Sequence, residues 1–128
     1  MKPELTLLVW SVALTFLQVL VATGFATLQV GLPLLAGNRE KMPELTGWAG
    51  RAQRAHANMI DNLVLFAALV LVAVVAGKTN STTLLGAQIF FSARVAYAIV
   101  YCVGIPWLRT MVWLASVVGM IMIYVQLC

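Results

Sequence analysis

Four long apolar runs dominate the chain, and short polar breaks separate them. The runs cover residues 5–35, 48–77, 82–104 and 107–127. Each run meets the requirement of roughly 20 residues for a helix that crosses a bilayer. The pattern predicts an all-α integral membrane protein, a four-helix bundle with helices over about residues 5–36, 48–77, 82–104 and 107–127.

Prolines, glycines and polar residues mark the expected helix ends. At about 1.5 Å per residue the first run would measure about 45 Å, so we expect this helix to tilt or to project from the bilayer. Pro33 and Gly37 are expected to weaken the end of this helix. Pro106 is well placed to begin the fourth helix. The main loop is expected at 37–47, with tight turns at 78–81 and 104–106.

The composition supports membrane insertion of a single domain. Of 128 residues, 62% are hydrophobic and 9% are charged, which lies far outside the range of soluble globular proteins. Residues 1–128 leave no room for a separate soluble module. The net charge of +4 is scattered through apolar runs and forms no basic patch, so nucleic acid is not an expected partner.

The basic residues predict the orientation of the chain in the membrane. With four spans, one side of the membrane carries Arg39, Lys41, Arg51, Arg54 and Arg109, and the other side carries Lys2 and Lys78. Because positive charge accumulates on the cytoplasmic side, we expect the 37–47 loop in the cytoplasm and both termini outside. The membrane would be the plasma membrane, which is the inner membrane in a bacterium.

A polar stripe on the second predicted helix is the first candidate site. At about 100° per residue, five side chains fall within roughly a 100° arc: Arg51, Arg54, Asn58, Asp61 and Asn62. An ionised side chain at membrane depth costs at least about 2.5 kcal/mol. Such a cost indicates a binding function for the stripe.

Arg94 is the other charged residue deep within an apolar run. It lies about 18 Å from the cytoplasmic end of the third helix, and Asp61 lies roughly 20 Å from the same end of the second. Since an unpaired buried charge is strongly unfavourable, the sequence predicts an ion pair between Asp61 and Arg94.

Two tyrosines and a further arginine extend the candidate site. Tyr97 and Tyr101 follow Arg94 at i+3 and i+7 and therefore share its helix face. Arg109 opens the fourth helix near the cytoplasmic edge. Because guanidinium groups bind carboxylates and phosphates, these residues predict a cavity for a small polyanionic or zwitterionic ligand, with an ammonium group facing Asp61.

Simpler interpretations remain open for several of these residues. Arg51 and Arg54 can act as topology determinants, and Tyr97 and Tyr101 as packing residues. Asn58 and Asn62 can cross-link helices, as polar side chains do in membranes. His56 lies roughly 140° from Arg51 on the helix, which favours a structural or intersubunit role, and with no second histidine or acidic cluster beside it no metal site is expected.

These residues together resemble a known family. The chain reads RAHANMID over residues 54–61 and RVAY over residues 94–97, followed by Tyr101, Pro106 and Arg109. This pattern, together with chain length and span count, resembles the MAPEG family, the membrane-associated proteins of eicosanoid and glutathione metabolism. The family includes microsomal glutathione transferase, leukotriene C synthase and microsomal prostaglandin E synthase, and the chain looks like its bacterial branch.

The resemblance implies a homotrimer of four-helix subunits that binds glutathione, as a co-substrate, between neighbouring subunits. It assigns glutathione contacts to the second and third helices, at Arg54, His56, Asn58, Asp61, Arg94, Tyr97 and Tyr101. Arg109 matches the arginine that stabilises the glutathione thiolate. A free thiol has a pKa of about 8.5, which a nearby cation lowers, and the thiolate then attacks a lipophilic substrate arriving from the bilayer.

The chain departs from the family pattern at three places. Asp61 replaces a glutamate, Trp113 stands where prostaglandin E synthase has a tyrosine, and no arginine occurs between Gln29 and Leu34. These departures favour generic conjugation or peroxidase activity over specialised eicosanoid synthesis. Two other classes stay open: a small four-span proton-coupled transporter, and a catalytically silent family member that only assembles or binds lipid.

Overall fold

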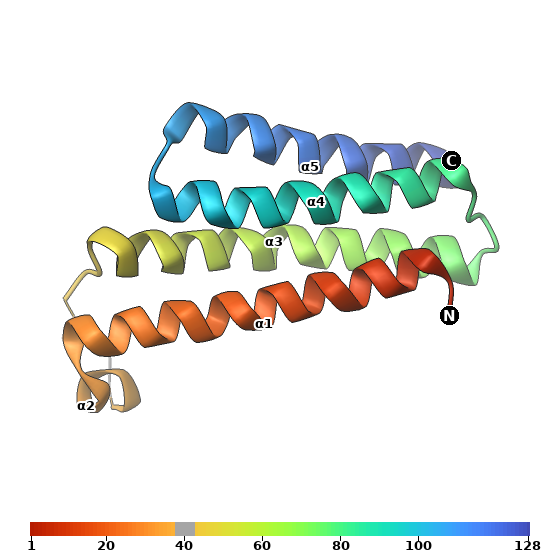
Figure 1. The fold of residues 1–128 in the computed structure, drawn as a ribbon. Helices are drawn as coiled ribbons and strands as arrows, with labels where there is room; N and C mark the ends of the chain where they lie inside the picture. Colours follow the sequence, from red (N-terminus) through yellow and green to blue (C-terminus); the bar gives the residue numbers. More distant parts are fainter. Residues whose placement is uncertain (38–42) are drawn as a thin grey trace.

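The computed structural model describes residues 1–37 and 43–128 and consists of long helices packed side by side. The elements are α1 (Pro3–Val30), α2 (Leu32–Ala36), α3 (Gly47–Val75), α4 (Ser81–Val103) and α5 (Pro106–Leu127). The four long helices alternate in direction, so both termini lie at one end of the bundle, with α2 and the α4–α5 turn at the other (Figure 1). Each of the four is long and apolar enough to cross a membrane. The predicted all-α membrane class is confirmed.

The first helix differs from its predicted extent at both ends. It begins at Pro3 and therefore includes Glu4, and it stops at Val30 instead of continuing to residue 36. The chain breaks at Gly31, where φ is +87°, and the short α2 then contains Pro33. Proline lacks a backbone N–H and its ring clashes with the carbonyl four residues earlier in a continuous helix. This is why the single helix predicted over 5–36 is wrong.

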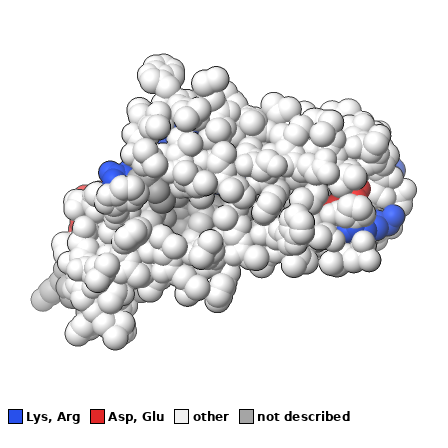
Figure 2. All heavy atoms as spheres, viewed as in Figure 1, with Lys and Arg blue, Asp and Glu red and all other residues white. Residues whose placement is uncertain are grey.

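Apolar packing fills the centre of the bundle. Phe66 of α3 and Phe90 of α4 are fully buried, and their rings stack with centroids 4.0 Å apart. Many large apolar side chains are exposed instead, including Leu17, Val64 and Ile99. Figure 2 shows charged side chains near the two ends of this face and uncharged side chains across its middle. That distribution suits a surface surrounded by lipid.

A polar network ties α1 to α4 at the end of the bundle that carries the termini. Asn80 caps α4 by accepting hydrogen bonds from the N–H groups of Thr82 and Thr83. The Thr83 hydroxyl donates to the buried Glu4 carboxylate at 2.8 Å. A carboxylate beside the first turn of α4 is favoured by the helix dipole, so the network fixes the start of α1 against α4.

Two facing glycines allow α4 and α5 to approach closely. A Cβ atom added at Gly119 would lie 2.5 Å from the carbonyl oxygen of Gly86, and one at Gly86 would lie 2.6 Å from that of Gly119. Small residues at such contacts let membrane helices pack tightly. This contact holds α5, and therefore Arg109, against α4.

We expect Gly119→Ala to lower the free energy of unfolding by roughly 1–3 kcal/mol, because the new methyl group forces the two backbones apart. Gly24→Ala is the matched control, since nothing lies within 4 Å of a Cβ atom at that helical position. It should be neutral or stabilising by at most about 1 kcal/mol. Thermal unfolding in detergent micelles, followed by circular dichroism, measures both; equal effects would contradict the close contact.

Candidate functional site

A cavity of about 310 Å³ lies between α3, α4 and α5. Its lining residues are Asn58, Tyr97, Arg109, Thr110 and Trp113. Arg109 stands in the first turn of α5, directly after the α4–α5 turn, whose Gly104 has a φ of +89°. This left-handed conformation is inexpensive for glycine and reverses the chain within two residues. The cavity therefore lies towards the end of the bundle opposite the termini.

Tyr101 stands between two guanidinium groups at the edge of this cavity. Arg54 donates a hydrogen bond from Nε to the Tyr101 hydroxyl at 3.0 Å. The Cζ atom of Arg109 lies 4.8 Å from the centre of the Tyr101 ring, and that of Arg54 lies 5.9 Å from it. Among residues 1–37 and 43–128, no carboxylate forms an ion pair with either arginine. Two cations around one phenol make a strongly positive site that favours an anion.

Asn62 holds Asn58 in place from behind. The Asn62 side chain is buried, and its amide donates to the main-chain carbonyl of Asn58 at 2.8 Å and to the Asn58 Oδ1 at 3.2 Å. These bonds fix the side chain of Asn58, which lines the cavity. Of the two asparagines predicted to contact the ligand, Asn58 lines the cavity and Asn62 bonds to it from outside the lining. The ligand contact itself stays a prediction.

Arg94 is buried beneath Tyr97 with most of its donors unused. Its exposed fraction is 1%, and its Cζ atom lies 4.2 Å from the centre of the Tyr97 ring. Its Nε donates to the sulfur of Met59 at 3.3 Å. Neither terminal guanidinium nitrogen has a hydrogen-bond partner in the part of the chain that the structure describes. Thioether sulfur is a weak acceptor, so this cation is poorly compensated within one subunit.

The predicted ion pair between Asp61 and Arg94 is wrong within the subunit. Asp61 lies on the exposed side of α3, whereas Arg94 is buried against Met59. The two residues were matched by depth along their helices, and depth does not fix direction around the helix axis. Met59 faces α4, and Asp61, two residues later, points roughly 200° away from it.

Arg51 and His56 lie outside the cavity. The Cζ atom of Arg51 lies 4.9 Å from the Trp48 ring centre, and its side chain runs beside Gly104 at the α4–α5 turn. His56 lines a separate cavity of about 220 Å³ between α1 and α3, with Thr23 and Gln53 among its neighbours. Its Nδ1 is buried and has no hydrogen-bond partner in the described structure. The predicted direction of His56, away from the stripe, is confirmed.

Two lining residues were not among the predicted site residues. Thr110 follows Arg109 directly, and Trp113 lies one helical turn beyond it. The i, i+4 spacing of Arg109 and Trp113 places both on one face, and this signal was available in the sequence. One subunit therefore brings together Arg54, Asn58, Tyr97, Tyr101 and Arg109, with Arg94 behind Tyr97.

Comparison with known families assigns the chain. The family model of the MAPEG family matches residues 7–128. The chain therefore belongs to the MAPEG family and is a multi-pass membrane protein. No curated protein and no solved structure matches it significantly.

We expect Arg94→Met to leave the ligand-free protein folded and to raise its free energy of unfolding by about 1–4 kcal/mol, because replacing a poorly paired buried charge by an apolar side chain relieves desolvation. The cation–π contact with Tyr97 offsets at most about 2 kcal/mol of this gain. The control Lys78→Met removes an exposed cation and should change stability by no more than about 0.5 kcal/mol. Thermal unfolding without ligand measures both; a lower midpoint for Arg94→Met would show that the arginine is already compensated.

Proposed function

We propose that the chain is a membrane-embedded glutathione-dependent transferase or peroxidase. The observation that supports this most strongly is the pair of guanidinium groups, Arg54 and Arg109, around Tyr101 beside the cavity lined by Asn58 and Tyr97. Family membership supplies the class of chemistry, since the family includes such enzymes. No metal enters the proposal: the described residues contain no cluster of three or more metal-ligating side chains.

The charges of the site suit the charges of glutathione. Its two carboxylates complement the guanidinium groups of Arg54 and Arg94, and charge-assisted bonds of this kind are about twice as strong as neutral ones. Its ammonium group complements Asp61. In this arrangement the free terminal nitrogens of Arg94 acquire an acceptor, and the exposed Asp61 acquires a cation.

Arg109 is the group proposed to activate the thiol. A cation beside a thiol lowers its pKa from about 8.5 and increases the thiolate fraction at neutral pH. Arg109 stands in the first turn of α5, where the positive end of the helix dipole adds to its effect. The thiolate then attacks an electrophilic carbon of a lipophilic substrate and forms a thioether, while the leaving group departs as an anion. With a hydroperoxide, the thiolate attacks the terminal oxygen: the O–O bond breaks, the sulfur becomes a sulfenic acid, and the alkoxide leaves as an alcohol after protonation. A second glutathione converts the sulfenic acid into glutathione disulfide and water.

A homotrimer would complete this site. Arg54 and Asp61 are exposed on the subunit, and charged side chains in a membrane-spanning helix face protein or water, not lipid. His56 and Gln53 lie on a different face, against α1. A head-to-tail contact joins two different faces and closes into a ring. We place the His56 face of one subunit against the Asp61 face of the next.

The proposed orientation follows the basic residues. The beginnings of α3 and α5 lie at the end of the bundle opposite the termini (Figure 1), and they carry Arg51, Arg54 and Arg109. Positive charge concentrates on the cytoplasmic side. We therefore place the 37–47 loop in the cytoplasm and both termini outside, so that the thiol co-substrate enters from the cytoplasm and the lipophilic substrate from the bilayer.

Calorimetric titration with glutathione tests the binding step. The wild-type protein should bind with a millimolar or tighter Kd, and Asp61→Ala should weaken binding about tenfold, equivalent to about 1.4 kcal/mol. Arg109→Ala should lower kcat towards chlorodinitrobenzene or a lipid hydroperoxide by about 10²–10³ through loss of charge stabilisation. Lys78→Ala, which removes a cation at the opposite end, should change neither quantity. Absence of binding to the wild-type protein would remove the proposal.

Subunit complementation tests the shared site. We expect Arg109→Ala and His56→Leu each to lower activity, because each removes one contribution to every site. Co-expression of the two variants should restore activity above the mean of the separate variants, since mixed assemblies contain sites with an intact Arg109 and an intact neighbouring His56. Activity equal to that mean would place both residues in one subunit's site or leave His56 outside it.

The two alternatives predict different results. A proton-coupled transporter should show proton-driven efflux from proteoliposomes that Asp61→Asn abolishes. The acidic residue of α1, Glu4, is not a good proton-carrying group for such a transporter. It lies in the first turn of the helix and accepts a hydrogen bond from Thr83. A silent member should assemble normally without thiol chemistry towards either substrate.

A further inference from the structure

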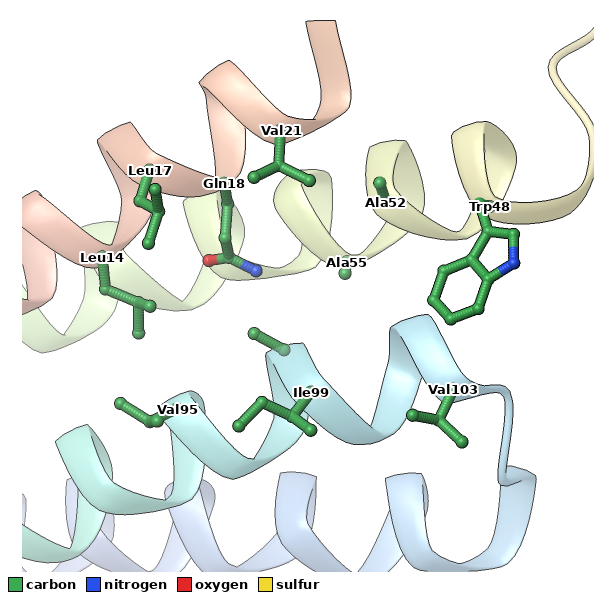
Figure 3. Close-up of a pocket in the computed structure, with 11 residues that line it drawn as sticks. Leu14, Leu17, Gln18, Val21, Trp48, Ala52, Ala55, Val95, Ile99 and Val103 are labelled. Atoms are coloured by element: carbon green, nitrogen blue, oxygen red, sulfur yellow. The ribbon is translucent and has the colours of Figure 1, made fainter. Parts of the chain in front are cut away.

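A further groove, distinct from the two cavities described above, lies on the side of the bundle formed by α1, α3 and α4. Its volume is about 460 Å³, within the range of small-molecule sites. Apolar side chains form nearly all of its lining, including Leu17, Val21, Trp48, Ala55, Ile99 and Val103 (Figure 3). It shares no lining residue with the cavity of about 310 Å³ that Arg109 lines. Ala55 packs on Tyr97 and Tyr101 and so separates this groove from the candidate site.

Gln18 is the polar residue of the groove. Its side chain is 9% exposed, and its Oε1 is buried without a hydrogen-bond partner in the described structure. Figure 3 shows the carboxamide pointing from α1 into the groove. The other buried polar residues nearby on α1 are satisfied: Ser11 and Thr15 donate to main-chain carbonyls one turn earlier, at 2.8 Å each.

The depth of Gln18 excludes bulk water as its partner. It lies about 22 Å from Pro3 and about 18 Å from Val30 along α1, at about 1.5 Å per residue, which is near the middle of the span. A polar group without a partner at that depth costs several kcal/mol. A partner that suits Oε1 at this depth is an uncharged hydrogen-bond donor carried by an apolar molecule.

The opening of the groove lies on the exposed apolar surface of the spans. Leu17, Val21, Ile99 and Val103 line it and are each more than a third exposed. At its end nearest the α4–α5 turn stands Trp48, with the Arg51 guanidinium 4.9 Å from its ring centre. A tryptophan with an arginine is typical of the membrane interface. This end of the groove therefore suits an anionic headgroup.

We infer that this groove binds a single-chain anionic lipid that carries a hydroxyl group within its chain. The headgroup lies at the Trp48 and Arg51 end, the alkyl chain fills the groove, and the hydroxyl donates to Gln18 Oε1. The Gln18 carboxamide points towards the part of α4 that carries Val95 (Figure 3), and Val95 and Ala98 line the groove with it. These residues are roughly 8–12 Å from Val103 along α4, so the hydroxyl stands at mid-chain and not beside the headgroup.

The inference does not depend on thiol chemistry. The lipid would lie on the other side of Ala55 from Tyr101 and would not be the molecule that the thiolate attacks. Its effect would be to hold α1 against α4. Arg109→Ala, which removes the proposed thiol activation, should therefore leave lipid binding unchanged, and the two proposals fail separately.

Native mass spectrometry of the full chain in detergent, titrated with four lipids, tests the inference. The probes are octadecanoic acid, its mid-chain hydroxy derivative, the methyl ether of that derivative, and the isomer hydroxylated next to the carboxyl group. The mid-chain hydroxy acid should bind about tenfold more tightly than the other three, since it alone places a donor at Gln18. Equal affinities for all four would overturn the inference.

Two groove variants and a matched control sharpen the test. Gln18→Leu should bind all four lipids alike, while Gln88→Leu, the same change at an exposed position of α4, should keep the preference. Ile99→Trp should fill the groove and abolish binding of every probe. A preference that survives Gln18→Leu, or binding that survives Ile99→Trp, would show that the lipid lies elsewhere. Should Gln18→Leu fail to fold, the wild-type preference and the Ile99→Trp result decide.

Discussion

The absence of water inside the bilayer is the constraint on which the whole structure depends. Each polar side chain within the spans needs a partner from the protein or from a bound molecule. Ser11 and Thr15 bond to their own helix, Asn62 bonds to Asn58, and Arg54 bonds to Tyr101. Among residues 1–37 and 43–128, the buried side-chain groups left without a partner are Gln18 Oε1, His56 Nδ1 and the terminal nitrogens of Arg94. These three mark where a lipid, a neighbouring subunit and an anionic co-substrate are proposed to bind.

The two ends of the bundle have different roles: one holds the helices together, and the other carries the candidate site. At the end with the termini, polar groups find hydrogen-bond partners within the subunit: Asn80 caps α4, and the Thr83 hydroxyl donates to Glu4. At the other end, Arg54 and Arg109 lie beside the Tyr101 ring, and no carboxylate of the described residues pairs with either of them. The close contact of Gly86 with Gly119 connects the two, because it fixes α5 on α4 and so sets the position of Arg109. Tight packing far from the site is therefore part of what shapes it.

Helical periodicity gave the direction of His56 correctly, but neither the arc count nor depth along the helix showed which polar residues share the cavity. The arc count placed His56 away from Arg54 and Asn58, as the cavities of the structure confirm. Depth alone paired Asp61 with Arg94, and this failed because Met59 occupies the side of α3 that meets Arg94. The first helix failed for a local reason: apolar composition continued through Gly31, but backbone geometry did not. Hydropathy reports where a chain is apolar, not where its helix breaks.

The sequence by itself determined the spans, the family and most of the residues of the candidate site, because period, length and charge are written along the chain. Only the tertiary structure decided which polar groups meet. It placed Tyr101 between Arg54 and Arg109, set Asn62 behind Asn58 and left Gln18 facing an apolar groove. Those outcomes depend on how each helix is rotated about its axis and packed on its neighbours. That rotation is a balance over many weak contacts between distant residues, and no local stretch of sequence contains it.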